Sequence, residues 1–104
     1  MRSPQFIPTY GGEQLMVRCA GCGELNLHAF RVQVFERRQE DAEDGRVVEV
    51  MYGKPIDTRN DAEHGNPSGR RNGIRIYFSC ECCPHISVLA LYQHKGTEYM
   101  TWLT

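Results

Sequence analysis

The five cysteines are the residues of this chain whose side-chain chemistry and spacing point to a functional site. Four of them form two pairs, each with two residues between its members: Cys19 with Cys22, and Cys80 with Cys83. Both thiolates of such a pair point into one turn, so two pairs can supply the tetrahedral set of four sulfurs that zinc favours. The sequence therefore predicts one structural zinc ion held by these four residues.

The same ligands leave alternatives open. Two pairs of this kind also hold iron in rubredoxin-like electron-transfer proteins, and either Cys82 or His85 could enter the metal shell. A catalytic zinc keeps one coordination position open, usually with His or carboxylate among three ligands, whereas four thiolates leave none. No Ser, Asp or second His stands at a spacing that suggests a catalytic triad. We therefore expect a protein that is not an enzyme.

Alternating apolar and polar residues surround both cysteine pairs, which is typical of strands. Between 25 and 34 the alternation slips by one residue, so this part is either two strands or one strand with a bulge. Residues 36–44 hold five acids and two arginines and are interpreted as a solvated connection, with at most a short helix over 39–43. The chain is thus expected to be all-β, with further strands over 15–17, 47–52 and 74–80.

The last segment, 86–103, predicts a hairpin around residues 94–96. A three-residue loop with glycine in third place fits a type I turn followed by a left-handed residue, here Gly96. That register would place Ala90 opposite Met100 and would gather the apolar residues on one face. A two-residue turn of Lys95 and Gly96 would shift the register and break this face, so the longer loop is favoured.

The length of 104 residues predicts a single domain over 1–104, with an irregular arm over 1–12 and a long flexible loop over 53–73. Leu, Ile, Val and Phe together make up only about a fifth of the chain, close to the level at which chains stay disordered. A core this thin usually needs a metal, a disulfide or a partner to fold firmly. An odd number of cysteines argues against a disulfide framework.

Composition also limits the partners. No apolar run approaches the roughly 20 residues that cross a bilayer, and residues 1–8 lack an apolar stretch of signal-peptide length, so we expect a cytoplasmic protein that binds no membrane. A net charge of −1 gives no global attraction to nucleic acid. The one basic cluster is either a solvated charged run or a set of nucleic-acid contacts, and the candidate contacts are Arg70, Arg71, Arg75 and Tyr77.

The two cysteine pairs, each between strands, resemble those of the zinc-ribbon superfamily. The C-terminal part is similar to small uncharacterised proteins of bacteriophages and prophages through FSCECCPH at 78–85, QHKGT at 93–97 and Trp102. The resemblance implies a zinc ribbon, with two cysteine knuckles on β-hairpins and a long inserted loop, and it implies that Cys82 is not a ligand. No activity follows from it. We expect a recognition module whose partner is a protein or a nucleic acid, and a homodimer is also possible.

Overall fold

The computed structural model describes residues 3–9, 11, 12 and 14–104, and the side chains of all of these except 56–58. Within them it contains strands and turns but no helix, so the expected all-β class is confirmed. Residues 39–43, where at most a short helix was expected, form bends and turns. The strands are β1 (Phe6–Pro8), β2 (Leu15–Val17), β3 (Leu27–Arg37), β4 (Gly45–Met51), β5 (Lys54–Arg59), β6 (Gly73–Cys80), β7 (Ser87–His94) and β8 (Thr97–Trp102).

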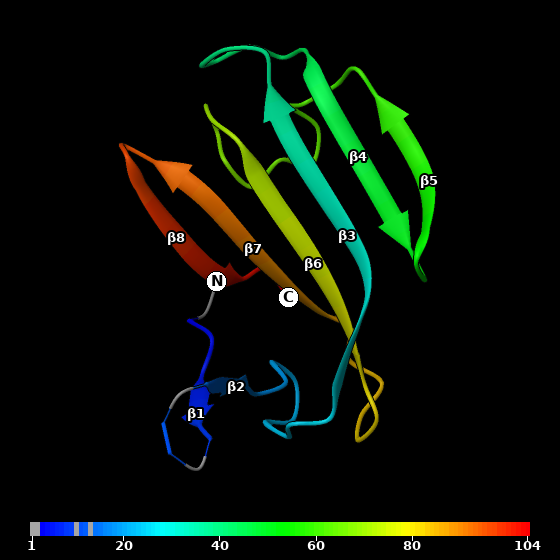
Figure 1. Ribbon diagram of the computed structural model, residues 1–104, viewed down its shortest axis with the longest axis vertical. Helices are drawn as coiled ribbons and strands as arrows, with labels where there is room; N and C mark the ends of the chain where they lie inside the picture. Colours follow the sequence, from blue (N-terminus) through cyan, green and yellow to red (C-terminus); the bar gives the residue numbers. More distant parts are fainter. Residues whose placement is uncertain (1–2, 10, 13) are drawn as a thin grey trace.

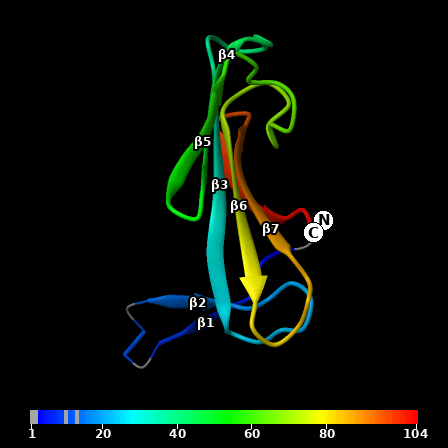
Figure 2. The same ribbon diagram turned by 90° about the vertical axis from the view of Figure 1, so that its right-hand side faces the viewer.

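Six of these strands form one antiparallel sheet in the order β5-β4-β3-β6-β7-β8, and β1 pairs with β2 in a separate hairpin. Figure 1 shows the large sheet face-on, with the β1–β2 hairpin below it. Figure 2 shows the sheet edge-on: the connection between β5 and β6 lies on one side of it, and β1–β2 projects to the other. The pairing of β3 with β6 at the centre brings both cysteine pairs to the same end of the sheet.

The slip in the alternation between 25 and 34 comes from a bulge within one strand. β3 pairs continuously with β6, and the register shifts between Ala29 and Arg31. An extra residue at a bulge moves the following side chains to the opposite face, which explains why the apolar positions change phase there. Of the two alternatives, the bulged single strand is confirmed.

The favoured register of the C-terminal hairpin is wrong by one residue. His94 lies opposite Thr97, so the turn contains only Lys95 and Gly96. Both turn residues have positive φ, 50° and 77°, as in a type I′ turn, whose twist matches that of paired strands. The face of the hairpin that packs on the core therefore consists of Leu89, Leu91 and Trp102, with Met100 beside them.

The long loop expected over 53–73 is partly a strand. Residues 54–59 form β5, which pairs with β4, and residues 60–72 pack on one face of the sheet. Ala62 is fully buried, and Gly65 lies against the ring of Phe35. The side chain of Asn66 donates hydrogen bonds to the carbonyls of Ala62 (2.8 Å) and Arg71 (2.9 Å). Polar contacts of this kind order a segment that has few apolar residues to bury. Within the arm expected to be irregular over 1–12, residues 6–8 form β1.

The hydrophobic core lies on the opposite face of the sheet, near the end that carries the cysteines. Ala20, Leu89 and Trp102 are its buried centre, and the ring of Phe78 meets that of Trp102 edge-on at 5.9 Å. Ala20 belongs to the turn between Cys19 and Cys22, so this turn packs directly on the sheet. Among the described residues, no helix exists that is long and apolar enough to cross a membrane.

Candidate metal centre

The fold brings the four paired cysteines together. Their sulfur atoms all lie within 4.8 Å of one another, with 3.7 Å between those of Cys19 and Cys83 and 3.7 Å between those of Cys22 and Cys80. Four sulfurs placed tetrahedrally at about 2.3 Å from a zinc ion lie about 3.8 Å apart. The cluster therefore has the dimensions of a site for one tetrahedral ion.

Local hydrogen bonds shape each cysteine pair into a knuckle. In the first knuckle, the N–H of Gly23 donates to the carbonyl of Cys19 at 3.0 Å, and the N–H of Gly21 points at the Cys19 sulfur at 3.3 Å. In the second, the N–H of Cys82 points at the sulfur of Cys80, also at 3.3 Å. Donors aimed at sulfur stabilise its thiolate form, which is the form that binds a metal.

The two knuckles touch through a glycine. A Cβ atom added to Gly21 would lie 2.6 Å from the Cβ of His85, closer than two such atoms can approach. His85 therefore packs against the first knuckle and lies outside the sulfur cluster. Cys82 also lies outside the cluster, and its sulfur accepts a 3.3 Å hydrogen bond from the side chain of Asn26. The four residues predicted as ligands are the four that converge.

The thiols of the cluster do not ionise equally. Burial opposes ionisation of Cys19, but hydrogen bonds from the backbone of Cys22 and Gly21 and from a serine hydroxyl outweigh it and lower its pKa to about 6. For Cys22 a backbone hydrogen bond at Glu24 favours the thiolate, yet desolvation and the neighbouring thiols prevail and raise its pKa to about 12. Such crowded thiolates repel one another, and a bound dication removes that repulsion.

Ser87 is a part of the site that the sequence did not reveal. It is completely buried; its hydroxyl accepts a 3.2 Å hydrogen bond from the N–H of Ala20 and lies 3.7 Å from the Cys19 sulfur. This one side chain fixes the first knuckle to the start of β7. A single serine at the head of an apolar strand has no distinctive spacing, so only the three-dimensional structure identifies it.

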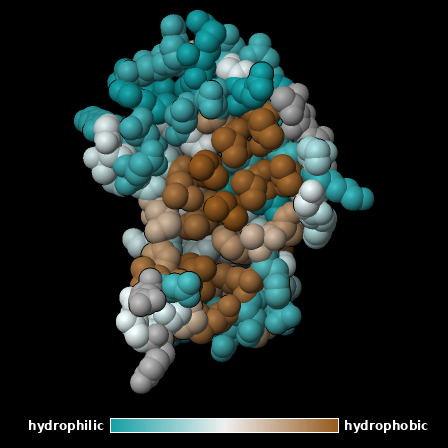
Figure 3. Space-filling model, in the orientation of Figure 1, coloured by the Kyte–Doolittle hydropathy of each residue, from teal (hydrophilic) through white to brown (hydrophobic). Residues whose placement is uncertain are grey.

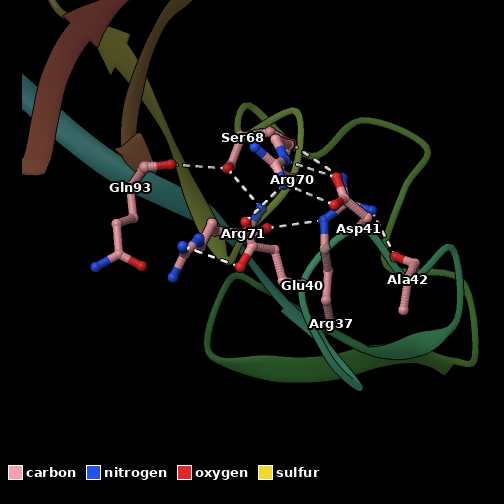
Figure 4. Close-up of polar contacts among 8 residues, drawn as sticks. All are labelled: Arg37, Glu40, Asp41, Ala42, Ser68, Arg70, Arg71 and Gln93. Atoms are coloured by element: carbon pink, nitrogen blue, oxygen red, sulfur yellow. Dashed lines mark hydrogen bonds and ion pairs between the residues drawn. The ribbon is translucent and has the colours of Figure 1, made fainter. Parts of the chain in front are cut away.

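The candidate nucleic-acid contacts are not assembled into one basic surface. Arg70 pairs with Asp41 through hydrogen bonds of 2.8 and 2.9 Å and also pairs with Glu40 at 2.8 Å. Arg71 pairs with Glu40 at 3.0 Å. Figure 4 shows these contacts between the acidic turn and the connection that follows β5. The acids of 36–44 thus neutralise the two adjacent arginines.

Arg75 and Tyr77 lie further along β6, on one face of the strand. The Tyr77 hydroxyl donates a 2.9 Å hydrogen bond to the side chain of Gln33, and the guanidinium of Arg31 stacks 4.7 Å above the Tyr77 ring. The ring already has partners within the chain.

Comparison with protein-family models, with characterised proteins and with solved structures returned no match for this chain.

Proposed function

We propose that this chain is a non-catalytic recognition module of the zinc-ribbon type, in which one zinc ion held by Cys19, Cys22, Cys80 and Cys83 stabilises the fold. The observation that carries the proposal is the pair of 3.7 Å sulfur–sulfur distances, each of which joins one knuckle to the other. This spacing matches one ion bridging both knuckles. Four thiolates fill a tetrahedral shell and leave no position for a substrate or a reactive water molecule.

A structural role for the ion also suits the size of the core. The buried centre next to the site consists of Ala20, Leu89 and Trp102, which is little apolar volume for a chain of 104 residues. Structural zinc contributes about 10–16 kcal/mol to the folding of small domains. That contribution is comparable with the entire stability of an ordinary domain, about 5–15 kcal/mol.

The ion pairs of the acidic turn favour a protein partner over a nucleic acid. Affinity for nucleic acid comes largely from cations that neutralise phosphates. Arg70 and Arg71 are already neutralised by Asp41 and Glu40, so a phosphate would have to displace these carboxylates. The module is therefore proposed to recognise a protein surface.

Elemental analysis of the protein, purified without added metal, tests the metal. One zinc per chain is the expected result, with retention in the variant Cys82→Ala and loss in Cys83→Ala. Stoichiometric iron with visible sulfur-to-iron absorption would instead support the rubredoxin-like electron-transfer alternative and overturn the proposal.

Capture of partners from a lysate, with and without nuclease treatment, tests the class of partner. A protein that is retained equally in both samples supports the proposal. Partners that disappear after nuclease treatment would favour nucleic-acid recognition instead.

A further inference from the structure

Two rows of apolar side chains cross five strands on one face of the sheet. Both rows follow from the strand register, in the order β4, β3, β6, β7, β8. The first row is Val48, Val34, Ile74, Leu91 and Met100. The second row is Val50, Val32, Ile76, Leu89 and Trp102. Figure 3 shows this face as a continuous hydrophobic surface over the middle of the sheet.

Only part of this face is covered by the chain itself. The first knuckle packs on the β7–β8 end of the second row, through Ala20 against Leu89 and Trp102. The first row is less well covered: Val34 and Met100 are each 40% exposed, and Val48, Ile74 and Leu91 are half-buried. The 60–72 connection cannot cover it, because it lies on the other side of the sheet (Figure 2). There it packs against Phe35, and Phe35 and Val34 are neighbours in β3, so their side chains point to opposite faces.

The whole chain exposes more surface than a compact monomer of its mass. The chain exposes 6774 Å², whereas a folded monomer of 11.9 kDa exposes about 6,000 Å². The excess is about 800 Å², which is the area that each partner contributes to a protein–protein interface of ordinary size. A radius of gyration of 14.7 Å, against about 13 Å for a compact domain of this length, reflects the same single-layered shape.

We propose that a second copy of this chain covers the face, so that two sheets pack as a sandwich around a two-fold axis parallel to the strands and centred on β6. This proposal rests on the proposed function, because it requires a folded chain with its metal bound. It extends that function by naming the partner of one surface. This axis sets Ile74 against the partner's Ile74, Val34 against the partner's Leu91, and Val48 against the partner's Met100. Away from the axis a small side chain thus meets a large one, as interdigitated cores require.

The charges at the end of the first row are complementary about the same axis. One step beyond it on the same face lie three exposed charged residues: Arg46 of β4, its cross-strand neighbour Glu36 of β3, and Glu98 of β8. The axis places Arg46 opposite the partner's Glu98, twice in each dimer. A two-fold axis perpendicular to the strands would reverse the ends of the sheet and separate these charges. The ion pairs therefore select the axis along the strands.

The proposed axis also places the first knuckle of each copy against the sheet of the other. In each copy it covers the β7–β8 half of the second row, while Val32 and Val50 in the β3–β4 half are only half-buried. Rotation about the proposed axis brings the knuckle of one copy over this β3–β4 half of the other. Both rows would then be covered along their whole length, which favours a second copy over an unrelated partner.

Sedimentation equilibrium of the zinc-loaded protein over a dilution series tests the inference with two neighbouring residues of β8. Met100 lies on the proposed interface and is 40% exposed, whereas Tyr99 lies on the opposite face and is 45% exposed. We expect a wild-type dimer, a rise in the dissociation constant of about 100-fold or more for Met100→Glu, because two charges would be buried, and little change for Tyr99→Glu. A wild-type monomer at every concentration overturns the proposal, as does a dimer that Met100→Glu leaves intact.

Charge reversal tests the axis without touching the core. Arg46→Glu and Glu98→Arg should each weaken the dimer by about tenfold, since each creates two like-charge contacts, and the double variant should regain most of the wild-type affinity. A double variant weaker than either single variant would overturn the proposed axis. Zinc content and circular dichroism, measured on the same samples, separate failure of the interface from failure of the metal site: a zinc-loaded monomer contradicts only the dimer.

Discussion

The guanidinium of Arg37 donates a 3.0 Å hydrogen bond to the backbone carbonyl of Ser68, which lies 31 residues further along the chain. It also donates to the carbonyls of Ala42 (2.6 Å) and Arg71 (2.9 Å), and the residue is only 8% exposed (Figure 4). One buried arginine thus joins β3, the acidic turn and the 60–72 connection. Because unsatisfied buried carbonyls are costly, this side chain holds the connection against the sheet.

Replacement of Arg37 should release that connection. Arg37→Met keeps the aliphatic length and removes every donor, so the free energy of unfolding should fall by about 2–4 kcal/mol. Trypsin should then cleave after Arg70 and Arg71 faster than in the wild type. Arg38→Met is the matched control, since the Arg38 pair with Asp44 is exposed and worth little. Equal cleavage rates in the two variants would contradict this role for Arg37.

Loss of one of the four proposed metal ligands should unfold the chain. Alanine at Cys19, Cys22, Cys80 or Cys83 removes one sulfur from the proposed zinc site, and structural zinc is worth about 10–16 kcal/mol in small domains. Circular dichroism and zinc analysis should show an unfolded, metal-free protein in each case. Cys82→Ala should keep both the fold and the zinc, because its sulfur lies outside the cluster. Wild-type folding after complete removal of metal would refute the structural role.

Gly21→Ala should disrupt the contact between the knuckles. Its Cβ would lie 2.6 Å from the Cβ of His85, so one knuckle must shift and the four sulfurs lose their spacing. We expect weaker zinc binding in a competition with a chelator, by about tenfold or more, and a lower Tm. Gly69→Ala is a suitable control, because a Cβ there meets nothing within 4 Å. Unchanged zinc affinity in Gly21→Ala would show that the knuckles do not need this approach.

The neutralised arginines lead to a prediction about oligonucleotides. In fluorescence anisotropy at low salt, the wild type should not bind single-stranded or duplex DNA. The double variant Glu40→Gln/Asp41→Asn releases Arg70 and Arg71, and should bind weakly with a slope of log affinity against log salt of about −2 to −3 if Arg75 also contributes. Binding by the wild type with the same affinity and slope would show that the ion pairs do not suppress it.

The Asp61–His64 contact predicts a specific titration. The imidazole Nδ1 lies 2.7 Å from the Asp61 carboxylate, and the hydrogen bond and charge of that carboxylate raise the pKa of His64 above its ordinary value near 6.5. This ion pair therefore stabilises the fold below about pH 6.5 and is lost as the pH rises through the higher folded-state pKa. An NMR titration should show the raised pKa, and Asp61→Asn should return it toward the ordinary value. Identical titration curves would contradict this assignment.

Patterns within the sequence were enough to predict the strands around the cysteines and which four cysteines converge. The alternation around Ile74 and the phase slip near Phe30 both correspond to features of the sheet, because alternation reports directly which face a side chain occupies. The cysteine spacing was equally informative, since two residues between ligands leave few ways to turn. That a metal binds there, and that it is zinc, stays a prediction.

Features that depend on the backbone or on distant partners were not predictable in the same way. The hairpin register was missed because Lys95 adopts a positive φ, which non-glycine residues seldom do. Residues 60–72 looked unstructured because their partners, above all the guanidinium of Arg37, come from a strand far away in the sequence. Likewise, the sequence could not place the acidic turn beside Arg70.

The separation of the two knuckles along the chain sets an order of events during synthesis. Cys19 and Cys83 are 64 residues apart, and closing a loop of that length costs roughly 4 kcal/mol of chain entropy. A nascent chain carries the first knuckle long before the second exists, and in the folded chain the pairing of β3 with β6 holds the two knuckles together. The four-sulfur site can therefore be completed only after Cys83 has been synthesised, so any stabilisation by a bound ion comes late in the life of the nascent chain.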